Sequence, residues 1–335
     1  MTDPAALHNA IREEVKDVLL GNETLIEGLT VSLLTHGHVL LEGVPGVAKT
    51  TAASLFARAS GMDYNRIQMT PDVLPADITG THVYREHAGE FELQRGPVFA
   101  NVVVADEINR ATPKTQSALL EAMAEERVTI EGETLELPEP FMVIATQNPL
   151  EMEGTFELPE AQRDRFQLKL TVSLPDRDTE RSLLTQFDSR PRLGPGDVRA
   201  VVSSAEVLDA REQVIGVHVS AELKEYVLDV VSATREHPDL DHGGSPRASL
   251  AFLHTAKARA AIRDREYVIP DDVKALAEPV LVHRLVMSTD AALSEVSAEE
   301  VIESVIERTE VPSGDSTPAR AVGDGGVPDQ GTDGE

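Results

Sequence analysis

A glycine-rich segment at residues 43–50 follows a short apolar run at residues 38–42 and precedes a helical pattern at residues 50–59. A loop between a strand and a helix presents backbone N–H groups at a helix N-terminus, and these groups bind phosphate. A lysine there supplies positive charge to the β- and γ-phosphates of a nucleotide, and the hydroxyl after it ligates Mg²⁺. The general motif has glycine where this chain has Ala48, so we expect a backbone that accepts a Cβ there. The predicted phosphate-binding residues are Gly43, Val44, Pro45, Gly46, Val47, Ala48, Lys49, Thr50 and Thr51.

Two further polar groups follow apolar runs. Asp106 and Glu107 end the run at residues 99–105, and Asn148 follows the run at residues 141–145. Polar side chains at the carboxyl ends of parallel strands line nucleotide sites, so Asp106 could hold Mg²⁺ through water and Glu107 could polarise the attacking water. Asn148 could orient that water or touch the γ-phosphate. The alternatives are two solvated acids at a strand end and an ordinary Asn-Pro turn.

The elements around these groups indicate an α/β fold. Apolar runs at residues 38–42, 99–105 and 141–145 have the composition of strands buried on both faces. They alternate with helical patterns, which favours a parallel sheet flanked by helices. We also expect two helices within residues 7–34, a helix beginning at Thr112-Pro113, and hairpins at residues 83–93 and 127–137.

The domain organisation follows from changes in composition. From about residue 205 the strand signal fades and amphipathic helices dominate, after a Pro- and Gly-rich connector at residues 190–196. The last 25 residues contain six Gly, three Pro and five acids, a composition typical of disorder. We therefore predict an α/β nucleotide-binding domain, a helical domain, a C-terminal helix or linker and an acidic tail. Their bounds are residues 1–190, 197–290, 291–310 and 311–335.

The charge of the chain restricts its partners. The 335 residues carry a formal net charge of −28, with 23 Arg, 7 Lys and no Cys. Such a surface repels nucleic acid and anionic lipid, and the absence of cysteine excludes disulfides and thiolate sites. Scarce lysine with excess acid suggests adaptation to concentrated salt, the alternative being an ordinary acidic cytosolic protein. With no apolar run near the ~18 residues of a spanning helix, we expect a soluble, cytoplasmic protein without membrane insertion.

The motifs resemble the MoxR family of AAA+ ATPases, in consistent order over roughly residues 15 to 290. The resemblance implies a P-loop AAA+ core that binds ATP and Mg²⁺, with the helical domain as a lid over the nucleotide. It also implies a homo-oligomeric ring, usually a hexamer, that hydrolyses ATP at subunit interfaces. The motifs that carry the resemblance are residues 43–50, 96–101, 105–111, 113–123, 145–149, 158–162, 164–166 and 245–247.

The resemblance also implies roles for single residues. Arg165 would be the arginine finger that reaches the neighbouring subunit, although Arg163, where the family generally has an apolar residue, leaves a second candidate two positions away. An isolated subunit would then be nearly inactive. The remaining assignments are Lys49 and Thr50 on phosphate and Mg²⁺, Asp106 and Glu107 as the Walker B pair, Asn148 as sensor 1, Arg247 as sensor 2, and Leu20 and Gly21 near adenine.

The expected function is remodelling or activation of a partner protein, which in this family often carries a von Willebrand A-type domain. The hairpins at residues 82–91 and 127–137 resemble the helix-2 insert and pre-sensor hairpin, which face a pore or a client. Alternatives are a magnesium-chelatase-type motor subunit, a nucleic-acid motor, and a scaffold that binds ATP with negligible hydrolysis. The acidic hairpins disfavour a nucleic-acid motor, and Glu107 disfavours the scaffold. The histidines, including His36 with His38 and His237 with His242, lack zinc spacing.

Overall fold

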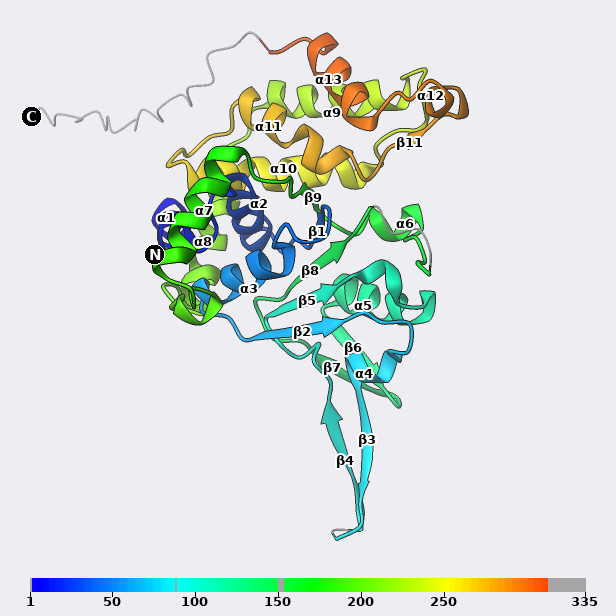
Figure 1. Ribbon diagram of the computed structural model, residues 1–335. Helices are drawn as coiled ribbons and strands as arrows, with labels where there is room; N and C mark the ends of the chain where they lie inside the picture. Colours follow the sequence, from blue (N-terminus) through cyan, green and yellow to red (C-terminus); the bar gives the residue numbers. More distant parts are fainter. Residues whose placement is uncertain (1, 88, 150–153, 313–335) are drawn as a thin grey trace, which may run out of the picture.

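The three predicted apolar runs form the middle of a five-stranded sheet in the computed structural model, which describes residues 2–87, 89–149 and 154–312. Its strand order is β2-β5-β8-β1-β9, and every pairing is parallel (Figure 1). The predicted fold class, a parallel sheet flanked by helices and followed by a helical region, is confirmed. The strands are β1 (Val39–Glu42), β2 (Tyr64–Gln68), β5 (Val102–Asp106), β8 (Met142–Gln147) and β9 (Leu168–Thr171).

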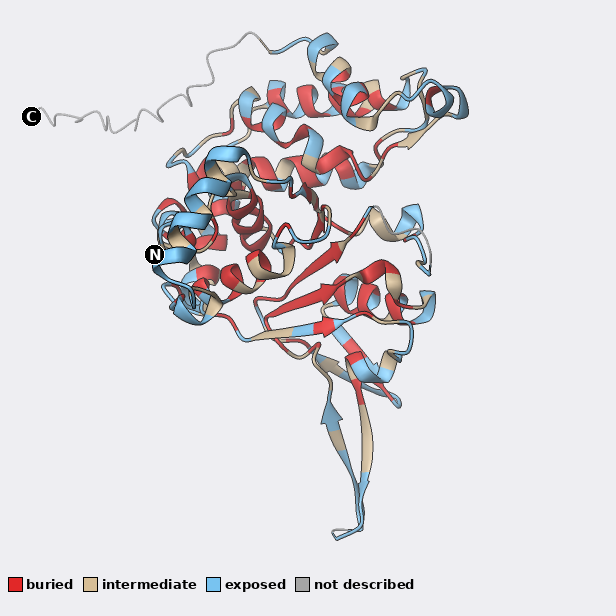
Figure 2. Cartoon of the chain, in the orientation of Figure 1, coloured by how far each residue is buried: buried red, intermediate tan, exposed pale blue. Residues whose placement is uncertain are grey.

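Alternate residues of the central strands supply two hydrophobic clusters, one on each face of the sheet. Val102 and Val104 of β5 join the cluster beneath α1, α2 and α3, whereas Val103 and Ala105 join the cluster beneath α5. All five residues of β5 are buried, as the continuous apolar run predicts (Figure 2). These helices are α1 (Pro4–Val15), α2 (Glu23–Leu34), α3 (Lys49–Ala59) and α5 (Pro113–Glu125).

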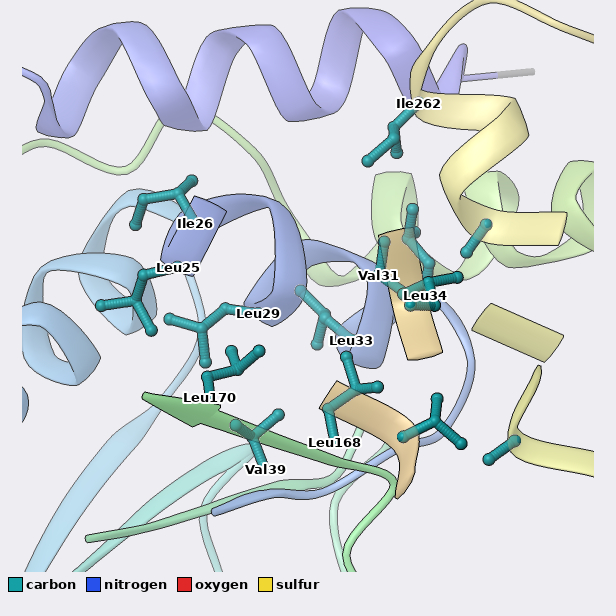
Figure 3. Packing of buried hydrophobic residues seen from close by; sticks show 14 of the residues in the cluster. Leu25, Ile26, Leu29, Val31, Leu33, Leu34, Val39, Leu168, Leu170 and Ile262 are labelled. Carbon is teal, nitrogen blue, oxygen red and sulfur yellow. The ribbon is translucent and has the colours of Figure 1, made fainter. Parts of the chain in front are cut away.

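The larger cluster joins the sheet to the helical part of the chain. Figure 3 shows Leu29 and Leu33 of α2 above Val39 and Leu168, with Ile262 of the same cluster on the side of α2 that faces away from the strands. Because α10 (Pro246–Ile262) packs on α1 and α2, the helical region contacts the α/β core through a continuous apolar layer. None of the described helices is long and apolar enough to cross a lipid bilayer.

The remaining elements are mostly helices, as expected for the region after about residue 205. The helices are α4 (Pro75–Thr79), α6 (Glu160–Arg163), α7 (Arg177–Ser189), α8 (Ser204–Gly216), α9 (Ala221–Arg235), α11 (Pro270–Leu281), α12 (Thr289–Leu293) and α13 (Ala298–Arg308). Short 3-10 turns lie at Ile108–Arg110 and Pro195–Asp197, and β10 (Leu240–His242) pairs with β11 (Val286–Met287). The helical region therefore contains a small two-stranded ribbon that the sequence did not indicate. The predicted domain bounds stay predictions, and residues 313–335 of the predicted tail lie outside the described residues.

Both predicted hairpins are present. In the first, β3 (Gly80–Arg85) pairs with β4 (Glu90–Arg95) and extends well away from the sheet (Figure 1). It is longer than its apolar residues indicated, because polar residues continue the pairing at both ends. The second hairpin joins β6 (Arg127–Ile130) to β7 (Glu133–Glu136) and lies beside the first at its base.

Candidate functional site

The predicted phosphate loop connects β1 to α3 at the carboxyl edge of the sheet. Helix α3 begins at Lys49, and the side chain of Ala48 before it makes no capping hydrogen bond. The first N–H groups of any α-helix have no partner within the helix, and the helix dipole favours negative charge there, so this helix end suits an anion. A Cβ on Gly43 would lie 2.4 Å from the backbone oxygen of Val172, so only glycine fits between this loop and the end of β9.

Ala48 adopts a left-handed backbone conformation, with φ 63° and ψ 27°. The sequence led us to expect a conformation that accepts a Cβ, but this one costs an L-residue about 1–2 kcal/mol. Glu107 is the second left-handed residue of the site, with φ 58° and ψ 53°. Two strained non-glycine residues in one loop cluster are typical of functional sites, where surrounding contacts hold the backbone in place.

Thr50 and Asp106 meet across the loop, as predicted. The Thr50 hydroxyl donates a hydrogen bond to Oδ1 of Asp106 at 2.8 Å. The ammonium group of Lys49 donates to the backbone oxygen of Val44 at 3.0 Å and also to that of Gly43, so it lies within the loop that it is predicted to serve. The structure thus brings the loop hydroxyl, the loop lysine and the first strand-end acid to one edge of the sheet.

Three donors surround the Asp106 carboxylate. Thr146 donates to Oδ1 at 2.6 Å and Arg66 donates to Oδ2 at 2.5 Å, in addition to the bond from Thr50. Burial raises the pKa of Asp106, but the hydrogen bonds from Thr146, Arg66 and Thr50 outweigh it and leave the pKa below its ordinary value. Asp106 is therefore an anion at neutral pH, as a magnesium ligand must be.

Glu107 is held by neighbours on both sides. Its carboxylate accepts a hydrogen bond from the Gln68 amide at 3.1 Å and one from Arg110 at 3.0 Å. Its backbone N–H donates to the Thr146 hydroxyl at 2.9 Å, so Thr146 joins the two acids. A carboxylate fixed in this way, with 30% of its side chain exposed, can accept a proton from a water molecule held in front of it.

Sequence reasoning missed Arg66, Gln68 and Thr146. The first two lie on β2, where the parallel register places Gln68 directly beside Asp106. Asn148, which was predicted, is buried at the carboxyl end of β8 and so lies at the same edge. The signal for β2 was weak because only Ile67 of its five residues is buried, which leaves no apolar run to detect.

The donor set at this edge fits Mg²⁺. It consists of a threonine hydroxyl and a carboxylate oxygen, both hard oxygen ligands that lie 2.8 Å apart. The described residues contain no group of three or more His, Cys, Asp or Glu side chains that could hold a metal ion. A site with one carboxylate suits Mg²⁺, which takes its other ligands from substrate phosphates and water.

Arg165 and Arg247 lie at the opposite edge of the sheet. Arg165 precedes β9 and Arg247 lies in the first turn of α10, and both line a cavity of about 390 Å³ with residues 35–38, which precede β1. The guanidinium group of Arg165 donates to the backbone oxygen of Leu120 at 2.6 Å. The Arg247 side chain is 58% exposed. The phosphate loop follows β1, so the two arginines are separated from the loop of their own chain by the length of the strands.

Asp164 ties these arginines to the helical region. It accepts hydrogen bonds from Ser245 at 3.1 Å and from Arg284 at 2.9 Å, and the nearest nitrogen of Arg247 lies 4.0 Å away. Arg163, the other candidate finger, lies on α6, and its Nε atom is buried without a hydrogen-bond partner among the described residues. Of these two arginines, Arg165 lines the cavity and Arg163 does not. Which of them acts as the finger stays a prediction.

Leu20 and Gly21 lie in the loop between α1 and α2. Gly21 has φ 75°, and a Cβ on it would lie 3.1 Å from the Thr179 side chain of α7. The Gln186 side chain of α7 donates to the backbone oxygen of Asp17 in the same loop. The structure thus places this loop against α7, and its contact with adenine stays a prediction.

Comparisons with known proteins agree with this arrangement. Residues 38–168 match the model of the ATPase family associated with various cellular activities (AAA), and residues 232–305 match that of the AAA lid domain. The chaperone MoxR1 of Mycobacterium tuberculosis is 45% identical over 91% of this chain and 82% of its own length. The protein MoxR of Paracoccus denitrificans is 34% identical over 81% of this chain and 86% of its own.

The fold is shared with a protein of solved structure. That protein, from Cytophaga hutchinsonii and assigned as an ATPase, is 38% identical, with a TM-score of 0.84 over 92% of this chain and 97% of the other. Extensive identity to MoxR proteins, an AAA domain and an AAA lid therefore place this chain in the MoxR family of AAA+ ATPases.

Proposed function

We propose that the chain is a Mg²⁺-dependent ATPase that forms a ring, usually a hexamer in this family, and remodels or activates a partner protein. The observation that carries the proposal is the hydrogen bond from Thr50 to Asp106, which joins the phosphate loop to the acid beside Glu107. These are the parts that phosphoryl transfer to water requires: a phosphate cradle, a metal ligand and a group that activates water.

Each residue at the carboxyl edge has a distinct task. The N–H groups at the start of α3 and the charge of Lys49 bind the phosphates, while Thr50 and Asp106 hold Mg²⁺, which neutralises charge on the β- and γ-phosphates when bound. Glu107 orients the attacking water and takes up its proton, and Asn148 orients the water or the γ-phosphate. Gln68 and Arg110 fix the Glu107 carboxylate, so its position is set before the nucleotide enters.

The opposite edge supplies its arginines to the next subunit. Because Arg165 and Arg247 lie away from the phosphate loop of their own chain, a head-to-tail assembly is what brings them to a γ-phosphate. A finger supplied in this way is worth about 10³–10⁵ in rate. The cavity position of Arg165 favours it over Arg163, whose Nε is buried.

The similarity to MoxR proteins, one of them named a chaperone, supports a protein client. We infer that this client carries a von Willebrand A-type domain and meets the ring at the β3–β4 or β6–β7 hairpin. The acidic residues of these hairpins, including Glu90, Glu92 and Glu133, disfavour nucleic acid as the client. A net charge of −28 further suggests that the protein works in the cytoplasm of a cell with concentrated salt.

The substitution Glu107→Gln tests the ATPase assignment. It keeps the shape of the side chain and its contacts with Gln68, but removes the proton acceptor, so turnover falls by about 10²–10⁴-fold while ATP binding persists. Phosphate release and binding of a fluorescent ATP analogue measure the two effects separately. The matched control is Glu133→Gln on the β6–β7 hairpin, which should hydrolyse ATP at the rate of the parent chain. Undiminished hydrolysis by Glu107→Gln would overturn the role of this residue.

A further inference from the structure

Arg284, which follows α11, binds the short segment of chain that carries Arg165. Its Nε donates a hydrogen bond to Oδ1 of Asp164 at 2.9 Å. Its Nη2 donates to the backbone oxygen of Phe166 at 2.7 Å, and its Nη1 donates to that of Gln167 at 3.1 Å. These acceptors lie on both sides of Arg165 in the sequence, so one guanidinium group holds the backbone from which the Arg165 side chain extends.

This contact is firm because the Arg284 side chain is buried, with 3% of it exposed. Burial lowers the pKa of Arg284, although the hydrogen bond and the charge of Asp164 act in the opposite direction. A buried cation is costly unless it is paired and hydrogen-bonded, so the group cannot leave its acceptors without a large loss. Nη1 also donates to the backbone oxygen of Val280 in the last turn of α11. A buried cation therefore joins α11 to the segment that carries Arg165.

His283 adds a second donor from the same place. Its Nε2 donates to the Phe166 oxygen at 3.0 Å, so this oxygen accepts two hydrogen bonds from the helical region. Burial lowers the pKa of His283 well below its ordinary value, and the charge of Arg284 acts in the same direction, so the ring is neutral. A neutral histidine donates from one nitrogen only, which matches the bond to Phe166.

The same contact extends to Arg247. Asp164 also accepts a hydrogen bond from the Ser245 hydroxyl at 3.1 Å, and Ser245 caps α10 by accepting one from the Arg247 N–H at 3.1 Å. Arg165, Arg247 and Arg284 all line the cavity of about 390 Å³, which we call the arginine cavity. Arg284 differs from the other two because each of its side-chain nitrogen atoms donates to a partner in its own chain. It therefore holds the wall of the cavity.

We propose that Arg284 is a positioning residue for Arg165, and that it fixes the point at which the Arg165 guanidinium enters the nucleotide site of the next subunit. This inference rests on the head-to-tail ring of the proposed function and adds a residue of the helical region on which the trans-acting arginine depends. A misplacement of about 1 Å in such a group costs up to ~100-fold in rate. We call the carboxyl edge of the sheet, with residues 43–50, the phosphate edge. A subunit without Arg284 still binds ATP at its own phosphate edge but activates its neighbour poorly.

The substitution Arg284→Lys tests the proposal. Lysine keeps the positive charge but has a single side-chain nitrogen, so it cannot bind Asp164 and both backbone oxygens in the geometry of the guanidinium group. We expect kcat to fall by about tenfold to a hundredfold, while KM for ATP keeps its parental value because the phosphate edge is untouched. A parental kcat in Arg284→Lys would overturn the proposal.

Mixing with Lys49→Ala subunits separates an effect on the neighbour's nucleotide from an effect on the subunit's own. Lys49→Ala is inactive at its own phosphate edge but has an intact Arg165 and Arg284. In an equimolar mixed ring, about one interface in four joins an intact phosphate edge to an intact Arg165. Turnover per subunit therefore rises several-fold above that of Arg284→Lys alone, whereas it would halve if Arg284 served the nucleotide of its own subunit. Phosphate release from rings of verified composition measures the difference, and halved turnover would overturn the proposal.

Arg265→Lys is the matched control for a general loss of stability in the helical region. Arg265 donates two hydrogen bonds to the buried carboxylate of Asp272, at 2.6 and 2.8 Å, and these bonds do not involve residues 164–167. Its loss should lower the free energy of unfolding in urea and leave kcat per folded subunit at the parental value. An equal fall of kcat in Arg265→Lys and Arg284→Lys would show that Arg284 acts only through stability, which would overturn the positioning role.

A second variant and a second mixture complete the test. If Arg284→Lys does not fold, Asp164→Asn replaces it, because asparagine keeps the shape of the acceptor and removes its charge; kcat then falls several-fold and recovers with Lys49→Ala in the same way. The mixture of Arg165→Ala with Lys49→Ala tests the proposed function itself. If that mixture is silent, the head-to-tail finger is overturned and the role of Arg284 with it. If that mixture recovers but the mixture with the Arg284 or Asp164 variant does not, the role of Arg284 alone is overturned.

Discussion

The carboxyl edge and the amino edge of the central sheet carry functional side chains of opposite charge. At the carboxyl edge, Asp106 and Glu107 are anions that the chain already surrounds with donors from Thr50, Thr146 and Gln68. At the amino edge, Arg165 and Arg247 line an open cavity and are held by few acceptors. Phosphoryl transfer needs acids that hold the metal and activate water, and it needs a cation that stabilises the charge of the transition state. The carboxyl edge has the acids, and the amino edge has the arginines.

This difference is what the proposed head-to-tail assembly requires of each subunit. A single chain that carried both halves at one edge would hydrolyse ATP without a neighbour. In the proposed ring, separating them along the length of the strands would make hydrolysis depend on contact between copies. The predictions below test how complete that division is.

The largest effect is expected when one edge loses the charged residue that the proposed reaction takes from it. Arg165→Ala removes the trans-acting cation and lowers turnover by about 10³–10⁵-fold, and Lys49→Ala abolishes activity at the other edge. Mixed rings contain some interfaces with an intact Lys49 and an intact Arg165, so mixing the two inactive variants restores part of the activity. Phosphate release from mixtures of verified composition measures the rescue. Silent mixed rings would show that Arg165 does not act in trans.

As the pH falls, we expect the amino edge of the sheet, where Arg165 lies, to lose stability at a higher pH than the carboxyl edge, where Asp106 lies. Burial lowers the pKa of His38, which lines the arginine cavity, to about 4, against an ordinary value of 6.5. Between these values the unfolded chain binds the extra proton, so stability is lost as pH falls, by about 2 kcal/mol between pH 7 and pH 5. His38→Gln keeps a donor for Met123 and an acceptor for Val143 but removes this dependence.

Urea unfolding at both pH values measures the effect. The matched control is Asp106→Asn, because the pKa of Asp106 lies below its ordinary value and the carboxylate does not titrate in this range. Its stability should therefore change with pH as that of the parent does. An unaltered pH dependence in His38→Gln would contradict the assignment.

A smaller effect is expected from substitution of Arg66, a cation of the carboxyl edge that binds Asp106 of its own chain. Arg66 donates to Oδ2 of Asp106, which leaves Oδ1 directed at Thr50. Arg66→Ala removes a charged hydrogen bond worth about 1.5 kcal/mol, so the Mg²⁺ concentration for half-maximal nucleotide binding rises about tenfold. Magnesium titration of analogue binding measures it, with Arg85→Ala on β3 as control. An unchanged magnesium requirement would show that Thr50 and Thr146 orient Asp106 without Arg66.

The smallest effect, a few-fold, is expected from salt. Subunits with net charge −28 repel one another, and the screening length falls from ~10 Å at 0.1 M to ~3 Å at 1 M salt. Assembly and turnover should therefore rise with added KCl before they fall as the arginine contacts are screened as well. A monotonic decline from low salt would show that attraction between the two edges outweighs the repulsion of the whole surfaces.

The residues at the carboxyl edge of the sheet were predicted better from the sequence than those at the amino edge, for a physical reason. The central strands are continuous apolar runs, so they and the polar residues at their ends could be located from the chain alone. The edge strands were not identified, because β2 has a single buried residue and the buried positions of β9 are interrupted by partly exposed ones, and Arg66 and Gln68 were missed with β2. Tertiary contacts of this kind leave little trace in a local pattern.

The position of Arg247 could not be predicted from its motif. A lid over the nucleotide would place it at the phosphate edge of its own chain, whereas the packing of α10 on α1 and α2 places it beside Arg165. This packing depends on apolar surfaces far apart in the sequence, so no local spacing encodes it. The motif identified the residue, and only the tertiary structure shows that it lies beside Arg165.

The hydrogen bonds of Asp164 would give the proposed ring a direction. Asp164 directly precedes Arg165 and is bonded to Ser245 and Arg284 of the helical region, so in the proposed ring a displacement of Arg165 would be transmitted to the orientation of its own lid. In a head-to-tail ring, the lid of each subunit would then respond to the nucleotide of one neighbour and not to that of the other. Successive hydrolysis events would follow one another around the ring with a fixed handedness, clockwise or anticlockwise.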